Sequence, residues 1–412
     1  MSDIRPFRAL RPRPELAPRL ASPPYDVLSS EEARAMAAGN ELSFLHVVKP
    51  EIDLPPDVDL YSDQVYAKGV ENLRRLIAAQ VLVREQRLAY YVYSQRMGEH
   101  RQYGVVCAAS CAEYEQGLIK RHEFTRRDKE DDRTRHVAEQ NANAEPVFFT
   151  YRRRDAINAL VDRVIAEEPV YDFVADDGIG HTVWVVPEAL TAALTQEFAA
   201  VEALYVADGH HRTASAARVG IERRAANPRH TGEEPYNYFM AVLFPHDQLK
   251  IMDYNRVVKD LAGRSREDFL AALTARFEVA PTDTPRPAAV HHFGMYLGGS
   301  WYRLIARPGT YPEGDPVRSL DASILQENLL GPELGIADPR TDTRIDFVGG
   351  IRGLGELEKR VHEGWAVAFA LHPVTLEQLM AVADAGQVMP PKSTWFEPKL
   401  RSGLLVRTLD TW

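Results

Sequence analysis

The residues best suited to chemistry lie in one short stretch, Leu204–Gly220. Its centre carries a carboxylate, two imidazoles, a guanidinium and a hydroxyl, in the order Asp208-Gly209-His210-His211-Arg212-Thr213. The apolar run Ala203–Ala207 predicts a buried strand, and the Ala-rich run Thr213–Val219 predicts a helix that Gly220 ends. The stretch therefore predicts a sharp strand-to-helix turn with its polar residues gathered at the bend.

This predicted turn has the properties of an anion site. Gly209 permits a close backbone approach, and the first N–H groups of the helix have no partner within it. His210, His211 and Arg212 add donors and charge where the helix dipole favours an anion, so phosphate is the expected ligand. The Thr213 hydroxyl could join them. In the alternative interpretation, Asp208 caps the helix and the histidines are solvated.

A second polar group follows another predicted strand, near 118–120. His122, Glu123 and Thr125 come at the start of a charged helix, where side chains often face a crevice. From Arg126 onward, the mixture of both charge signs is typical of a solvated helix with ion pairs. The sequence leaves open whether the trio is functional and whether it meets the turn at His210.

The third candidate is the Pro-rich tail Gly386–Leu400. Lys392, Ser393 and Thr394 lie between prolines and could hold an anion or close the site. A proline-stiffened connection to a final strand explains the same residues equally well.

Composition narrows the class of protein. The chain has 412 residues, enough for two or three domains, with 45% hydrophobic and 26% charged residues. A net charge of -10 and the absence of a basic face argue against nucleic acid as a partner. No apolar run approaches membrane-spanning length, and the N-terminus has no signal-peptide pattern. With Cys107 and Cys111 as the only cysteines, we expect a cytoplasmic protein.

The order of predicted elements indicates an α/β (α+β) architecture with mixed sheets. We expect an N-terminal body over residues 1–262 that contains the anion-binding turn. A C-terminal α+β domain over 263–412 is expected to close the cleft over it.

Four motifs in this order resemble the domain-of-unknown-function family 1015 over nearly the whole length. They are Arg5-Pro6-Phe7 with Pro23-Pro24-Tyr25-Asp26-Val27, Lys120-Arg121-His122-Glu123-Phe124-Thr125, Ala207-Asp208-Gly209-His210-His211-Arg212, and Met389-Pro390-Pro391-Lys392-Ser393-Thr394-Trp395-Phe396-Glu397-Pro398-Lys399. The turn Asp208–Arg212 also resembles the nucleotide-binding turn of the ParB and sulfiredoxin superfamily, which includes free serine kinases. This second resemblance implies a ParB-like nucleotide-binding core.

The favoured function is a kinase, a transferase that moves a phosphoryl group from ATP or ADP to a small hydroxyl compound. Such transfer needs hydrogen-bond donors that hold the phosphate oxygens, usually Mg²⁺, and a carboxylate that orients or deprotonates the acceptor hydroxyl. The backbone of Gly209–Arg212 would hold phosphates, Glu123 would be the base, and Asp208 or Glu123 would hold magnesium. His122 and Thr125 would bind the substrate. Free serine is the acceptor that the resemblance suggests.

Two alternatives remain open. A metal-dependent hydrolase would use His122, Glu123, Asp208, His210 and His211 as ligands, because imidazole and carboxylate suit a metal that activates water. A nucleotide-responsive switch without catalysis would use the same turn. The sequence is compatible with a homodimer and does not identify the nucleotide or the acceptor.

Overall fold

The computed structural model describes residues 2–412, so Met1, the first residue of the predicted N-terminal body, lies outside the described residues. Contacts divide the chain into two compact units. The first contains the residues up to Leu249 together with Pro398–Trp412, and the second is Lys250–Glu397. Each unit combines a sheet with helices, and the first sheet pairs strands in both directions, so the predicted α/β class with mixed sheets is confirmed.

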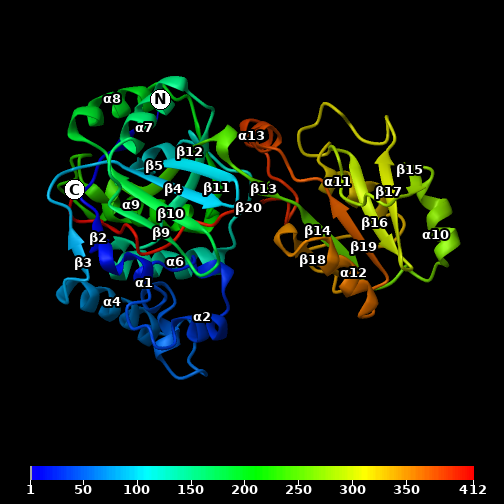
Figure 1. Ribbon diagram of the computed structural model, residues 1–412, viewed down its shortest axis with the longest axis horizontal. Helices are drawn as coiled ribbons and strands as arrows, with labels where there is room; N and C mark the ends of the chain where they lie inside the picture. The colour runs from blue at the N-terminus through cyan, green and yellow to red at the C-terminus, as the bar shows by residue number, and fades with distance from the viewer. Residues whose placement is uncertain (1) are drawn as a thin grey trace. The chain divides into compact units, whose positions relative to one another are not determined.

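A nine-stranded sheet organises the first unit (Figure 1). Its strands, in spatial order, are β6 (Ile119–Lys120), β11 (Leu204–Asp208), β8 (Val147–Tyr151), β12 (Tyr238–Pro245), β5 (His100–Ser110), β4 (Tyr91–Met97), β10 (Gly180–Val185) and β9 (Tyr171–Val174), with β1 (Ile4–Arg5) beside β5. The central strand β12 is buried along its whole length, in keeping with its continuous apolar sequence. Two short pairs flank the sheet, β2 (Leu10–Pro12) with β3 (Leu82–Arg84) and β7 (Ala142–Asn143) with β21 (Arg407–Thr408).

Helices cover both faces of this sheet. In Figure 1, α7 (Asp155–Ile165) and α8 (Glu188–Ala199) lie above it, and α4 (Asp63–Ala78) and α6 (Arg127–Gln140) lie below it. The apolar stripes of α7 and α8 pack on the strands to form the larger core of the unit. The remaining helices are α1 (Ala17–Leu20), α2 (Ser30–Ala37), α3 (Leu45–Val48), α5 (Cys111–Glu115) and α9 (His210–Ala226).

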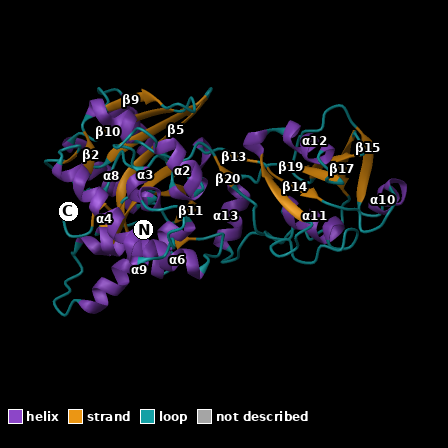
Figure 2. Ribbon diagram, turned by 90° about the horizontal axis from the view of Figure 1, so that it is seen from below, coloured by secondary structure: helices purple, strands orange, loops and turns teal. Residues whose placement is uncertain are grey.

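The second unit has its own sheet and core. Its six antiparallel strands are β15 (Phe277–Pro281), β17 (Ser300–Ala306), β16 (His292–Leu297), β19 (Val367–Leu371), β14 (Tyr254–Val258) and β18 (Ile345–Gly349). Its helices are α10 (Arg266–Leu273), α11 (Asp321–Leu325), α12 (Leu354–His362) and α13 (Leu376–Asp384), and a π-helical turn, η6 (Gln326–Leu330), extends α11. Figure 2 shows these helices and strands in a second view.

The units divide at a different place from the predicted boundary at 262/263. The chain enters the second unit before that point, because β14 pairs with β18 and β19. It returns to the first unit at Pro398, because Ser402 bridges to Ser22 and Val406 to Leu10. The second unit is thus an insertion within the first. Its two ends lie side by side, since β13 (Ile251–Met252) pairs with β20 (Trp395–Phe396).

The predicted end of the central helix at Gly220 is wrong. Helix α9 continues to Ala226, and Gly220 lies within it. A Cβ at Gly220 would stand 2.5 Å from the carbonyl oxygen of Tyr236 and 2.8 Å from Cys111 Sγ. Glycine is needed there for close packing rather than for a turn.

Two expectations from composition can be compared with the structure. Cys107 and Cys111 are both buried and unbridged. Among the described residues, no helix is both long enough and apolar enough to cross a bilayer.

Candidate functional site

Two neighbouring parallel strands bring the two polar stretches together. Strand β6 pairs with β11 in register, Ile119 opposite Leu204 and Lys120 opposite Tyr205. Because parallel strands end at the same edge of a sheet, the residues that follow each strand meet there. His122 and Glu123 after β6 therefore lie beside His210 at the start of α9. The short motifs in the sequence did not reveal this meeting.

The turn between β11 and α9 leaves helix amides available. Gly209 has a φ of 83°, in the left-handed region that favours glycine, and no side chain caps the helix among the described residues. The first backbone bond runs from Thr213 N to the Gly209 carbonyl, at 2.9 Å. The amides of His210, His211 and Arg212 precede it and are available to an anion.

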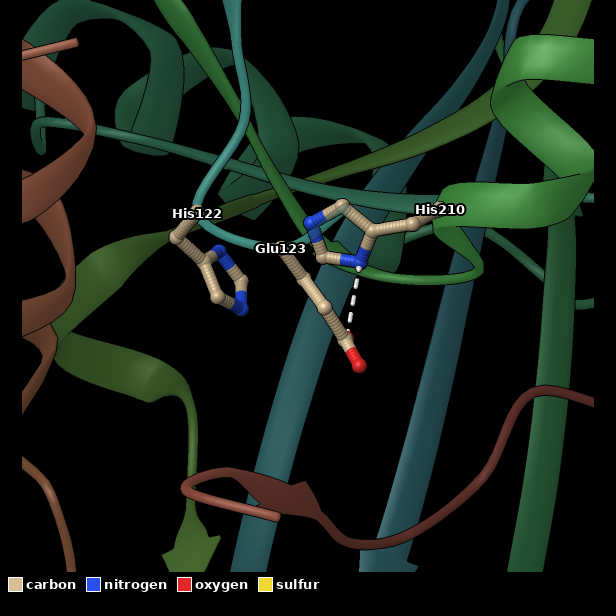
Figure 3. A group of neighbouring side chains, drawn as sticks. All are labelled: His122, Glu123 and His210. Carbon is tan, nitrogen blue, oxygen red and sulfur yellow. Dashed lines mark ion pairs between the residues drawn. The ribbon is translucent and has the colours of Figure 1, made fainter. Parts of the chain in front are cut away.

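His122, Glu123 and His210 form a compact cluster at this turn (Figure 3). One ligand atom from each lies within 4.8 Å of the others. Glu123 Oε2 stands 3.5 Å from His210 Nδ1, and the two imidazole rings meet edge to face with centroids 4.5 Å apart. His122 and His210 are buried, whereas about half of the Glu123 side chain is exposed.

The imidazoles of this cluster have unsatisfied nitrogens. Both ring nitrogens of His122 and Nε2 of His210 are buried without a hydrogen bond of good geometry to any described residue. Burial lowers the pKa of His122 to about 4, although Asp208 works against the shift. Burial, with the nearby His122, also places the pKa of His210 well below its usual value. Both rings are therefore neutral at pH 7, the state in which imidazole binds a metal or accepts a proton.

Asp208 is ionised and held by two cations. Its Oδ1 is 3.3 Å from Lys399 Nζ, and its Oδ2 is 3.3 Å from Arg212 Nη2. Burial works to raise the pKa of Asp208, but Lys399 and Arg212 outweigh it and hold the pKa below its usual value. The sequence analysis gave Asp208 or Glu123 as the magnesium ligand, and that role stays a prediction for both. Among the described residues, the compact group is His122, Glu123 and His210.

Lys399 is a site residue that the sequence analysis did not single out. It lies 191 positions from Asp208, in the same unit. The sequence feature that could have pointed to Lys399 is its place at the end of the tail motif, seven residues after Lys392. The tail's ion pair with the turn therefore uses a different lysine from the one predicted.

Arg212 points into the protein rather than toward an exposed anion. Its side chain is 6% exposed, and Nη1 donates to the Pro146 carbonyl at 2.8 Å. Nη2 lies 3.6 Å from Asp26 Oδ2, in addition to its contact with Asp208. Asp26 belongs to the Pro-Pro-Tyr-Asp-Val motif, for which the sequence suggested no role. Arg212 thus joins that motif to the turn.

The other predicted residues of the turn have local partners. His211 Nε2 accepts a bond from the Arg126 amide at 3.0 Å. Thr125 Oγ1 donates to Glu130 Oε2 at 2.8 Å. Thr213 is fully buried, and its hydroxyl donates to the Gly209 carbonyl at 2.9 Å, which argues against the predicted phosphate contact.

Lys392, Ser393 and Thr394 belong to the second unit. Ser393 Oγ donates to the Pro390 carbonyl at 2.6 Å, and the Lys392 carbonyl accepts a bond from Arg256 at 3.1 Å. Their contribution to a nucleotide site stays a prediction.

The sequence of the chain matches the profile of one known protein family. The profile of a family described as "Protein of unknown function (DUF1015)" matches residues 4–323. The chain belongs to this family. Three of the four motifs quoted above lie within the matched residues, and the tail motif lies beyond them. No curated protein matches this DUF1015 chain.

Solved structures that are similar to the DUF1015 chain include a free serine kinase in complex with AMP. It is 12% identical, covers 73% of this chain and 92% of its own, and has a TM-score of 0.34. A conserved hypothetical protein from Pyrococcus furiosus is 13% identical, covers 75% and 97%, and has a TM-score of 0.33. SbnI with a C-terminal truncation, from Staphylococcus aureus, is 11% identical, covers 73% and 87%, and has a TM-score of 0.36.

The DUF1015 site combines three chemical capabilities. The start of α9 offers backbone donors to an anion. Asp208 and Lys399 supply one ionised carboxylate and one ammonium beside it. The cluster at His122 supplies neutral imidazoles and a partly exposed carboxylate, which can accept a proton or bind a metal.

Proposed function

We propose that the chain is a nucleotide-dependent phosphotransferase that acts on the hydroxyl group of a small molecule. The observation that carries the proposal is the meeting of Glu123 with the start of α9, where a half-exposed carboxylate stands beside helix amides that have no partner within the helix. Phosphoryl transfer depends mainly on positioned donors and on a group that orients the acceptor hydroxyl. Both requirements have residues at this one edge of the sheet.

Each residue has a distinct role in the proposal. The amides of His210, His211 and Arg212 would hold phosphate oxygens, with Lys399 as a nearby positive charge. Glu123 would accept the proton of the acceptor hydroxyl. Arg212 would be a positioning residue, because it ties the turn to the Pro146 carbonyl.

ATP or ADP with Mg²⁺ is the proposed cofactor pair. Magnesium binds through carboxylates and phosphate oxygens, and Asp208 is the ionised carboxylate best suited to it. The ion would neutralise charge on the transferred phosphoryl group. Free serine is the first acceptor to test.

The first experiment measures nucleotide binding and transfer in the full chain. We expect ATP or ADP with Mg²⁺ to raise the melting temperature, and serine to give a phosphorylated product. Glu123→Gln should keep the thermal shift but lower kcat about 100-fold or more, in the range of general-base contributions. Glu115→Gln, at an exposed ion pair with Arg224, is the matched control. A protein with no nucleotide-dependent shift contradicts the proposal.

A metal-dependent hydrolase is the second candidate, and the cluster of His122, Glu123 and His210 favours it. Two imidazoles and one carboxylate suit Zn²⁺ or Mn²⁺ better than Mg²⁺, which prefers an all-oxygen environment. Stabilisation by Zn²⁺ or Mn²⁺ that His210→Ala abolishes, without any response to nucleotides, would favour the hydrolase over the phosphotransferase.

A further inference from the structure

The second unit has a half-open cavity that the proposed function does not use. Its volume is about 450 Å³, and it lies between the α11–η6 segment, strands β14 and β18, and the start of the tail motif. Its wall is largely apolar and includes Ala322, Leu330, Phe347, Val388, Met389 and Pro391. Cavities of roughly 300–1,000 Å³ with apolar walls and few polar groups are typical of small-molecule sites.

One cation in this cavity has no counter-charge. Arg256, on β14, is only 4% exposed and lines the cavity. Its Nη1 donates to the Tyr254 carbonyl and its Nη2 to the Lys392 carbonyl. Among residues 2–412, no carboxylate lies within ion-pair distance of it. Burial lowers the pKa of Arg256 to about 10, which shows how poorly its charge is compensated.

The two carbonyl contacts of Arg256 leave several of its guanidinium N–H groups for a ligand. A guanidinium has five N–H groups, and the two carbonyl contacts use one on each Nη. One further N–H on each Nη and the Nε–H remain. Two oxygens of a planar carboxylate match such a fork.

The other charges around the cavity pair with one another. Arg318 Nη2 lies 2.9 Å from Glu327 Oε2, and Arg340 Nη2 lies 2.7 Å from Asp338 Oδ2. Three arginines and two acids line the cavity, so its lining carries one net positive charge, which corresponds to Arg256. A single negative charge on a ligand would balance it.

Two features, one in the wall and one directly after the lining residue Pro391, point to specific recognition. Gln326 begins the π-helical turn η6, and its Oε1 is buried without a hydrogen-bond partner among the described residues, while its Nε2 donates to the Ile336 carbonyl. Lys392 has a φ of 58°, a strained conformation for a lysine, at the segment that Arg256 holds. Isolated π-helical turns and strained residues often occur at functional sites.

We propose that this cavity binds a small monocarboxylate with an apolar body. The carboxylate pairs with Arg256, and the apolar body packs against Phe347 and Met389. This site is independent of the phosphotransferase proposal, because all of its residues belong to the second unit.

Calorimetric titration of the full chain tests the proposal with four probes: benzoate, mandelate, benzamide and inorganic phosphate. Benzoate and mandelate should both bind, because each is a monocarboxylate with an apolar ring, and neutral benzamide should bind at least tenfold more weakly than benzoate. Benzamide binding equal to benzoate, phosphate binding tighter than benzoate, or no binding by either carboxylate would overturn the assignment.

Two variants locate the site. Arg256→Met should weaken benzoate at least tenfold, whereas Arg352→Met, at an exposed arginine of the same unit, should not change it. Because Arg256 also holds backbone carbonyls, Ala322→Leu provides a second test that leaves Arg256 in place and fills the cavity. Ala322→Leu should also weaken benzoate at least tenfold, and unchanged binding in a folded variant excludes the cavity as the site.

Discussion

At the scale of single residues, the buried imidazole of His122 makes stability depend on pH. The folded protein holds His122 neutral down to about pH 4, whereas an unfolded chain protonates it near its ordinary pKa of 6.5. Acid therefore favours the unfolded state, and stability present above pH 6.5 is lost as the pH falls toward 4. This difference in the pKa of His122 between the folded and unfolded states corresponds to about 3 kcal/mol.

The prediction is tested with His122→Phe. Between pH 7 and pH 4, this variant should lose about 3 kcal/mol less free energy of unfolding than the wild type, because its ring takes up no proton. Urea unfolding at several pH values gives the difference directly. His181, which burial also makes hard to protonate, remains in both proteins and cancels in the comparison. Parallel pH profiles for the two proteins would contradict the prediction.

The ion pair between Lys399 and Asp208 leads to a prediction about binding. Lys399→Met removes one of the two positive charges that contact Asp208, so we expect nucleotide affinity to fall about tenfold, equivalent to about 1.4 kcal/mol. Calorimetric titration with ATP and Mg²⁺ measures it. Lys68→Met, at a surface pair with Glu71, should leave the affinity unchanged. Equal affinities for both variants would remove Lys399 from the site.

The sequence predicted which residue types form the candidate site better than it predicted which residues they contact. His122, Glu123 and His210 were chosen by residue type and by their places after predicted strands, and the structure brings them together. Arg212 was expected to face an anion, but it contacts the Pro146 carbonyl and Asp26 instead. Residue type gives the charge of a side chain. Its direction depends on partners elsewhere in the chain, which a single sequence does not reveal.

At the scale of elements, Gly220 within helix α9 leads to a testable prediction about stability. In an ordinary helix interior, changing glycine to alanine stabilises by about 1 kcal/mol. At Gly220 the new methyl group would meet the Tyr236 carbonyl at 2.5 Å, so Gly220→Ala should instead destabilise by about 1–3 kcal/mol. Thermal unfolding measures the change.

Gly355 in α12 is the matched control, because it is exposed and a Cβ there would meet nothing within 4 Å. Gly355→Ala should be neutral or slightly stabilising. If alanine stabilises the protein at both positions, the neighbours of Gly220 shift easily enough to admit a methyl group, and the prediction is wrong.

Strands and helices near the site were largely predictable because their patterns are local. The apolar run at Ala203–Ala207 became β11, and the charged run after Arg126 became α6. The end of α9 was not predictable, because the need for glycine at position 220 arises from Tyr236 and Cys111. A glycine in a helical pattern has the same appearance whether it ends the helix or admits a neighbour.

At the scale of the whole molecule, the last fifteen residues belong to the first unit. Arg407 is fully buried there, and its two terminal nitrogens donate to the carbonyls of Tyr238 and Pro235, each at 2.6 Å. Deleting residues 398–412 would remove these contacts together with Lys399. We expect the shortened protein to lose most hydrogen-exchange protection in the first unit and to retain it in Lys250–Glu397.

Hydrogen exchange read by mass spectrometry separates the two units. If β5 and β12 are protected in the shortened protein as strongly as in the full chain, the tail is dispensable for the fold of the first unit.

The predicted boundary at 262/263 missed this organisation, because pairing of the tail with Leu10 and Ser22 links positions almost 400 residues apart. No local change of composition marks such a return.

The inserted second unit also sets the order in which the protein can be completed during synthesis. A ribosome releases Asp208 and His210 long before Lys399, with all of Lys250–Glu397 emerging in between. The second unit has its own sheet and core, so it can fold while the first unit still lacks its tail. The ion pair at Asp208 forms only after the inserted unit has been made, so a nascent chain stalled before Pro398 cannot carry the assembled candidate site.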